Sequence, residues 1–166
     1  MNPFNSRYSR LGLLGLGIVA GAAGVGLSGR ARSADLPVYR PTISDLMTAA
    51  IQPRHIKLWL AGNAGNWDYA DYEARNLAGA LGRVAAALPN YQDVPTAELL
   101  SDFAKPQLEA VEAAVKAKDE RAFASAYDGL TLGCNQCHQA TGHALVVIQD
   151  PGSNPFPDQD FRPRSN

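Results

Sequence analysis

The sequence predicts an all-α protein, an antiparallel bundle of four helices. After Pro41, apolar residues recur at the three- and four-residue spacing of helices, and the alternation typical of strands is almost absent. Connections of modest length separate the helical stretches, which favours neighbouring helices that run antiparallel. A length of 166 residues fits one compact domain, and an apolar fraction of 46 % excludes a wholly disordered chain.

Residues 1–33 have the layout of a secretory signal peptide. Two arginines precede an unbroken apolar run of 17 residues, Leu11 to Leu27, and small residues at Ala31 and Ser33 fit cleavage after Ser33. An uncleaved anchor is the alternative, because 17 residues is near the short limit for a membrane span, but six glycines weaken that interpretation. We therefore expect an exported, periplasmic protein that is held at the membrane only if the leader is retained.

The rest of the chain divides into a helical domain, residues 34–149, and an irregular tail, residues 150–166, with four prolines. Prolines interrupt helices because they lack an amide hydrogen, so two of the expected helices should kink or split. The expected helices are Ile43–Ala61 (N-cap Thr42 or Ser44, kink at Pro53), Trp67–Leu88, Thr96–Lys118 (split at Pro106), and a last helix from the N-cap Asp119 to about Ile148.

Charge is distributed unevenly along the chain. Residues 1–34 hold four basic residues and no acid, whereas residues 35–166 hold 11 basic and 16 acidic residues, a net charge of −5. A chain without a basic excess is not expected to bind nucleic acid. The acidic exported part favours a partner protein with a basic docking surface.

The last expected helix carries both cysteines of the chain within one apolar stripe. The stripe follows steps of three and four residues and comprises Phe123, Tyr127, Leu130, Cys134, Cys137, Thr141, Leu145 and Ile148. Within it lies the sequence Cys134-Asn135-Gln136-Cys137-His138, and Cys-x-x-Cys-His is the attachment motif for a c-type haem. Thiols three residues apart share one side of a helix and can both bond one porphyrin, while the adjacent imidazole can ligate its iron.

Three other uses of the same residues stay open. A periplasmic dithiol oxidoreductase could use the Cys pair, although that chemistry usually follows a strand and none is expected before Cys134. A mixed zinc site could combine both cysteines with two histidines. A structural disulfide is the simplest alternative, but three-residue spacing within a helix strains the bond.

The chain resembles the class II c-type cytochromes, the cytochrome c′ type, over roughly Ser44 to Ile148. The segment from Asp119 to His138 is the most similar part, and the motif begins at residue 134 of 166, near the C-terminus as in that family. The resemblance implies a four-helix bundle with one haem c attached to its last helix through Cys134 and Cys137, with His138 as axial ligand. Because such cytochromes are often dimers, a homodimer is compatible with it.

The resemblance also implies that the first helix faces the opposite side of the haem. Met47 is the candidate sixth ligand by family position, and His55 is its rival. Eight residues of helix separate them by about 12 Å, so they cannot both ligate one iron. His143 lies five residues after His138, about 140° around a continuous helix, and is expected at the surface.

The sequence thus predicts a periplasmic c-type cytochrome that carries single electrons between redox partners. Apart from the cysteines, no acid–base pair or activated nucleophile stands out, so we do not expect an enzyme. The alternative is a haem protein that binds or senses NO or CO at an open sixth coordination site.

Overall fold

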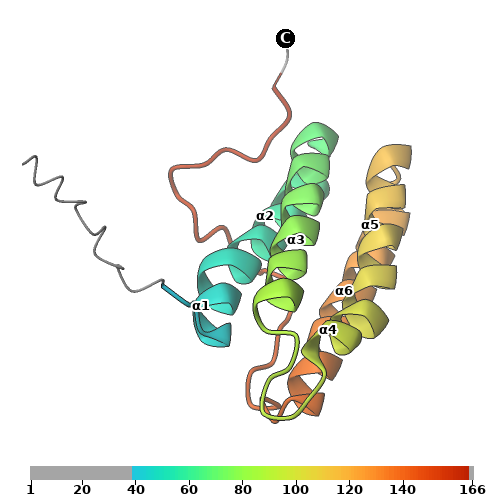
Figure 1. Cartoon of the computed structure of the whole chain (residues 1–166). Helices are drawn as coiled ribbons and strands as arrows, with labels where there is room; N and C mark the ends of the chain where they lie inside the picture. The colour runs from blue at the N-terminus through green and yellow to red at the C-terminus, as the bar shows by residue number, and fades with distance from the viewer. Residues whose placement is uncertain (1–38, 165–166) are drawn as a thin grey trace, which may run out of the picture. The chain divides into compact units, whose positions relative to one another are not determined.

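The structure is a computed structural model that describes residues 39–164, all of which belong to one compact unit (Figure 1). The signal peptide expected over residues 1–33 lies outside the described residues. Across residues 39–164 the regular secondary structure is helical, with one isolated β-bridge between Tyr91 and Val94, so the all-α prediction is confirmed. Within the same range, none of the helices is both long and apolar enough to cross a membrane.

Four helical segments follow one another along the chain. Two of them are single α-helices, and the other two each contain a short π-helical stretch between α-helical parts. The bounds are α1 (Ile43–Leu46), η1 (Met47–Ile51) and α2 (Gln52–Asn63); α3 (Trp67–Ala87); α4 (Thr96–Leu99), η2 (Leu100–Ala104) and α5 (Lys105–Ala117); and α6 (Glu120–Ala140).

The segments pack around a shared apolar core, as in a helical bundle. Helix α2 contacts α3 and α6, and α5 contacts α3 and α6. The largest fully buried side chains come from all four segments, so each contributes its apolar face to the core. They include Leu58, Leu77, Val84, Val111, Phe123, Tyr127 and Leu130.

Side-chain caps fix where the helices begin. Thr42 forms a capping box with Asp45, and the Asp119 carboxylate accepts hydrogen bonds from the amides of Arg121 and Ala122. Such caps satisfy backbone amides that have no partner inside the first turn. The expected N-caps Thr42 and Asp119 are therefore confirmed.

The two π-helical stretches both end just before a proline. Gln52, the residue before Pro53, donates its amide hydrogen to the carbonyl of Met47, five residues earlier. Lys105, before Pro106, donates in the same way to Leu100. A proline cannot supply the next backbone donor, so the helix widens by one residue before it and then continues. The expected interruptions at Pro53 and Pro106 are thus local changes of helical register.

The prediction that the last helix extends to about Ile148 is wrong. Helix α6 ends at Ala140, and Gly142 adopts a positive φ of 76° that favours glycine. The chain then turns back, so the apolar stripe does not continue beyond Thr141. Leu145, which the stripe placed in the core, is 88 % exposed.

The tail is irregular as expected, but it packs on the helices. The Asn66 side chain donates to the carbonyl of Arg162, and the hydroxyl of Tyr69 donates to the side chain of Gln159. The buried ring of Phe161 stacks on Tyr69 at a centroid distance of 5.3 Å. These contacts hold the tail against α3.

Candidate functional site

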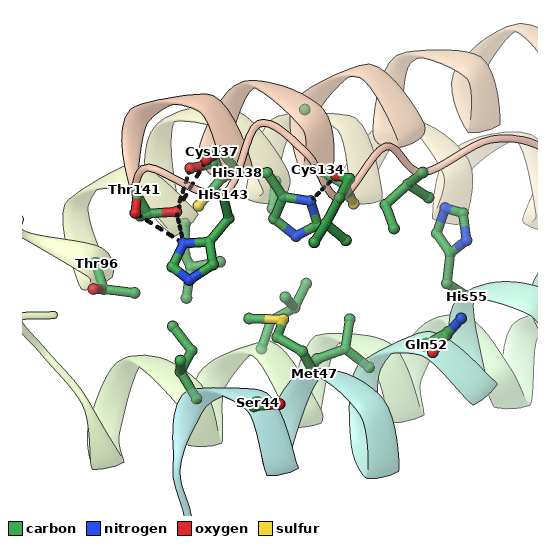
Figure 2. Close-up of a pocket in the computed structure, with 18 of the residues that line it drawn as sticks. Ser44, Met47, Gln52, His55, Thr96, Cys134, Cys137, His138, Thr141 and His143 are labelled. Carbon is green, nitrogen blue, oxygen red and sulfur yellow. Dashed lines mark hydrogen bonds between the residues drawn. The ribbon is translucent and has the colours of Figure 1, made fainter.

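A cavity of about 340 Å³ lies between the first segment, the third segment, α6 and the loop that follows α6 (Figure 2). This volume is within the range of small-molecule and cofactor sites. All five side chains singled out from the sequence line it, and they are Met47, His55, Cys134, Cys137 and His138. Its other lining residues are mostly apolar and include Ile51, Leu81, Leu100, Ala104, Val146 and Ile148.

Helix α6 presents both cysteines on this cavity because it approaches η2 closely. A side chain on Gly133 would lie 2.3 Å from the backbone carbonyl oxygen of Phe103, so the two backbones could not approach this far with any other residue. Cys134 and Cys137 follow directly on the same helix, one turn apart. The glycine therefore sets the position of the wall that carries the thiols.

Both thiols are free and neither is activated. Burial raises the pKa of Cys134 to about 11, and burial also raises the pKa of Cys137. Reactive cysteines in redox enzymes have the opposite property, a lowered pKa that favours the thiolate. The environment therefore disfavours thiol–disulfide exchange by this Cys pair.

A hydrogen bond from the ring fixes the orientation and the tautomer of His138. Its Nδ1 lies 2.8 Å from the carbonyl oxygen of Val146. Because a carbonyl can only accept, Nδ1 carries the hydrogen, and Nε2 keeps its lone pair in the neutral ring. Metal-binding histidines commonly bond a carbonyl in this way, which orients the ring and raises its basicity.

The loop that supplies this carbonyl is tied back to α6. The side chain of Asn135 accepts from the amide of Ile148 at 2.7 Å and donates to the carbonyl of Ile148 at 2.9 Å. This two-bond pairing gives an irregular segment a fixed position relative to the helix. Neither Asn135 nor the loop was singled out from the sequence, because the pairing depends on the reversal after Ala140.

Met47 lies on the opposite wall of the cavity from His138 (Figure 2). It is partly buried and is the first residue of the π-helical stretch η1. Single π-helical turns are frequent at functional sites, because they rotate the following side chains relative to a regular helix. Met47 therefore faces the Cys-x-x-Cys-His motif across the cavity from an irregular helical turn.

His55 lines the end of the same cavity, but both of its ring nitrogens have partners. Nδ1 lies 2.8 Å from the hydroxyl of Tyr127, and Nε2 lies 3.2 Å from the hydroxyl of Thr131. The side chain is only 5 % exposed, and this burial lowers the pKa of His55 to about 4. At neutral pH the ring is therefore uncharged and engaged with α6.

The expectation that His143 is a surface residue is wrong. Because α6 ends at Ala140, His143 sits in the returning loop and lines the cavity. Its Nδ1 bonds the carbonyl of Thr141 at 2.8 Å, and its ring packs against Tyr91. The Nε2 atom consequently keeps its lone pair. The signal in the sequence was Gly142, a turn residue that should have ended the helix.

The donor set of the cavity fits one covalently attached haem. Two thiols on one helix side and an imidazole with a free Nε2 are the groups that haem c requires. A mixed zinc site would need several His, Cys, Asp or Glu side chains arranged around one ion. No group of three or more such side chains is arranged in this way within residues 39–164.

No family model, curated protein or solved structure matches this chain.

Proposed function

We propose that the protein is a periplasmic c-type cytochrome that carries single electrons on an antiparallel four-helix bundle. Cys134 and Cys137 form thioether links to one haem c, and His138 is its proximal ligand. The observation that supports this most strongly is the cavity itself, which brings the Cys-x-x-Cys-His motif opposite Met47. The similarity to class II cytochromes supports the same assignment, because their motif also lies on the last helix.

Haem c supplies an iron that changes between the ferrous and ferric states. The chain supplies everything that holds and tunes it. His138 offers Nε2, and the carbonyl of Val146 keeps the ring in position. The mostly apolar lining lowers the polarity around the bound group, which is one of the properties that set its potential.

Met47 is the sixth ligand in this proposal. It is half-buried on the wall across from His138, and a thioether ligand opposite an imidazole is typical of electron carriers and raises the potential. His55 is the poorer candidate, since using either ring nitrogen would break a hydrogen bond to Tyr127 or Thr131. The acidic exported part, with a net charge of −5 over residues 35–166, favours a redox partner with a basic surface.

Replacement of both cysteines by serine tests haem attachment. The double variant Cys134→Ser/Cys137→Ser should lose all haem that survives denaturation, because the thioether links cannot form. The wild-type and variant chains are expressed with a periplasmic haem-attachment system and compared by mass and by haem staining of denaturing gels. Retention of covalent haem in the double variant, or its absence from the wild type, would contradict the proposed function.

An absorption spectrum tests the sixth ligand. The reduced wild-type protein should show sharp α and β bands that CO leaves unchanged, and Met47→Ala should become high-spin and bind CO. His143→Ala serves as the matched control, since it removes the other cavity side chain with a free donor and should keep the wild-type spectrum. A CO-sensitive, high-spin wild type would support gas binding instead, and the reverse pattern in the two variants would assign the ligand to His143.

A further inference from the structure

His55 separates two cavities. One is the 340 Å³ cavity of the Cys-x-x-Cys-His motif. The other, of about 300 Å³, lies between α2 and residues 147–155, and it is lined by His55 together with Asp150. Figure 2 shows His55 at one end of the first cavity. Gln52 and Ile148 also line both cavities, and among these three shared residues His55 alone is titratable and buried.

Hydrogen bonds connect His55 to Asp150 through a single hydroxyl. The hydroxyl of Thr131 lies 3.2 Å from Nε2 of His55 and 3.4 Å from the carboxylate of Asp150, a long contact. On the other side of the ring, the hydroxyl of Tyr127 donates to the carbonyl of His55, so Nδ1 must be the donor to Tyr127.

The two contacts of Thr131 need two hydrogens, and its hydroxyl has one. The second hydrogen must come from Nε2 of a protonated His55 or from a protonated Asp150. If neither carries it, one of the two contacts loses its hydrogen bond. The geometry therefore defines a cluster, His55–Thr131–Asp150, that is fully hydrogen-bonded only when it holds one additional proton.

The surroundings favour that proton on Asp150 and disfavour it on His55, whose pKa is lowered by burial. Desolvation and a hydrogen bond with the carboxyl of Asp128 raise the pKa of Asp150, although the residue remains accessible to solvent. The positive charges of Arg54 and Lys57 act on Glu73 of α3. The titratable side chains that interact with the cluster or with its neighbour Tyr127 are Tyr127, Asp128 and Cys134 on α6, and Arg54 and Lys57 lie within two residues of His55 on α2.

We propose that the His55–Thr131–Asp150 cluster is a proton-binding site whose occupancy is linked to the charge of the haem cavity. When the haem cavity gains one electron from a one-electron donor, one proton moves from a hydronium ion of the solvent to the cluster. The O–H bond of the hydronium ion breaks and leaves water, and an N–H bond forms at Nε2 of His55 or an O–H bond on Asp150. The added charges of the electron and the proton cancel. The inference rests on the proposed function and adds proton uptake to it.

The physical reason is reciprocal coupling between two charges. Adding an electron to a buried site strengthens proton binding nearby, and the bound proton stabilises the reduced state by the same free energy. The coupling is transmitted through a low-dielectric wall, since His55 is buried. Burial lowers the pKa of His55 to about 4 and raises the pKa of Asp150, and a nearby added electron should raise both, so we expect proton uptake between pH 4 and 7.

The test measures the midpoint potential of the haem-loaded full chain at an electrode from pH 4 to pH 8. In the wild type the potential should fall as pH rises through the interval from 4 to 7, approaching about 59 mV for each tenfold change in proton concentration. Asp150→Asn and Thr131→Val should flatten this dependence. Proton uptake on reduction, followed with an indicator in unbuffered solution near pH 5, should approach one per haem and nearly vanish in Asp150→Asn.

Asp158→Asn is the matched control, because it removes an exposed carboxylate of the same tail and should keep the wild-type slope. A wild-type potential that stays constant from pH 4 to 7 overturns the inference and leaves the electron carrier intact. A slope that Asp150→Asn and Thr131→Val leave unchanged belongs to another acid, such as a haem propionate, and overturns it as well. A wild-type chain that holds no covalent haem removes the proposed function and, with it, this inference.

Discussion

The two halves of α6 share one apolar stripe but have opposite surroundings. In the first half, Phe123 and Tyr127 are enclosed by the rings of Trp59 and Trp67, and the core is closed. In the second half, from Gly133 onward, the same face borders a cavity, and the side chains that η1 and η2 contribute to it are Met47, Thr48, Ile51, Leu100 and Ala104, none of them aromatic. The periodicity of one helix therefore tells which face is turned inward, and the size of the side chains opposite decides whether that face meets a core or a cavity.

The largest effect on stability should follow from opening the closed half. Phe123→Ala removes a ring that is 2 % exposed and packs against Trp59, Trp67 and Gly62, and it should lower the free energy of unfolding by about 3–5 kcal/mol. Denaturant titration measures this. Leu132→Ala, at a position on α6 that is 58 % exposed, is the control and should change stability by less than about 0.5 kcal/mol. Equal losses in the two variants would contradict the assignment of a closed core.

The free energy of unfolding should depend on pH through His55, the buried imidazole of α2 that bonds α6 between its two halves. Burial lowers the pKa of His55 from the ordinary 6.5 to about 4, so the unfolded chain binds this proton more readily than the folded one. The associated stability is fully present above pH 6.5 and is lost as pH falls towards 4, in total about 3 kcal/mol. Unfolding curves at several pH values measure the loss, and His55→Gln should remove this part of it. A ring that titrates near 6.5 by NMR would contradict the prediction.

A smaller effect is expected where the open half meets η2. Gly133→Ala places a methyl group 2.3 Å from the carbonyl oxygen of Phe103 and should cost about 1–3 kcal/mol through overpacking. Gly82→Ala is the control, because no atom outside its own helix lies within 4 Å of the added carbon. There the substitution should stabilise by up to about 1 kcal/mol, since alanine favours helix. If both variants changed the free energy of unfolding in the same direction, the close approach of α6 to η2 would not be fixed.

Local signals were sufficient for much of the fold. The helical spacing, the caps at Thr42 and Asp119 and the interruptions at Pro53 and Pro106 all depend on residues within one or two turns of each other. The end of α6 was misplaced because the apolar spacing continues to Ile148 while the turn at Gly142 overrides it. Backbone conformation at this glycine outweighed the regular helical spacing of Leu145 and Ile148.

Contacts between distant segments account for what the sequence left open at the site. The motif residues could be named in advance, because their spacing is itself the signal. The partners of His55 could not, since Tyr127 and Thr131 lie 72 and 76 residues away and meet it only through the packing of α2 on α6. His143 was missed for the related reason that a loop, unlike a helix, has no period from which a direction can be read.

The position of the motif near the C-terminus also has a consequence for biosynthesis. The chain is made from its N-terminus, and its early parts can begin to fold first. Met47, Ile51, Leu100 and Ala104, which line the far walls of the cavity, are therefore synthesised before either thiol. The loop that positions His138 comes later still, with Val146 and Ile148. The wall of the cavity that carries the two thiols and His138 is thus synthesised after the walls that α1, η1 and η2 supply.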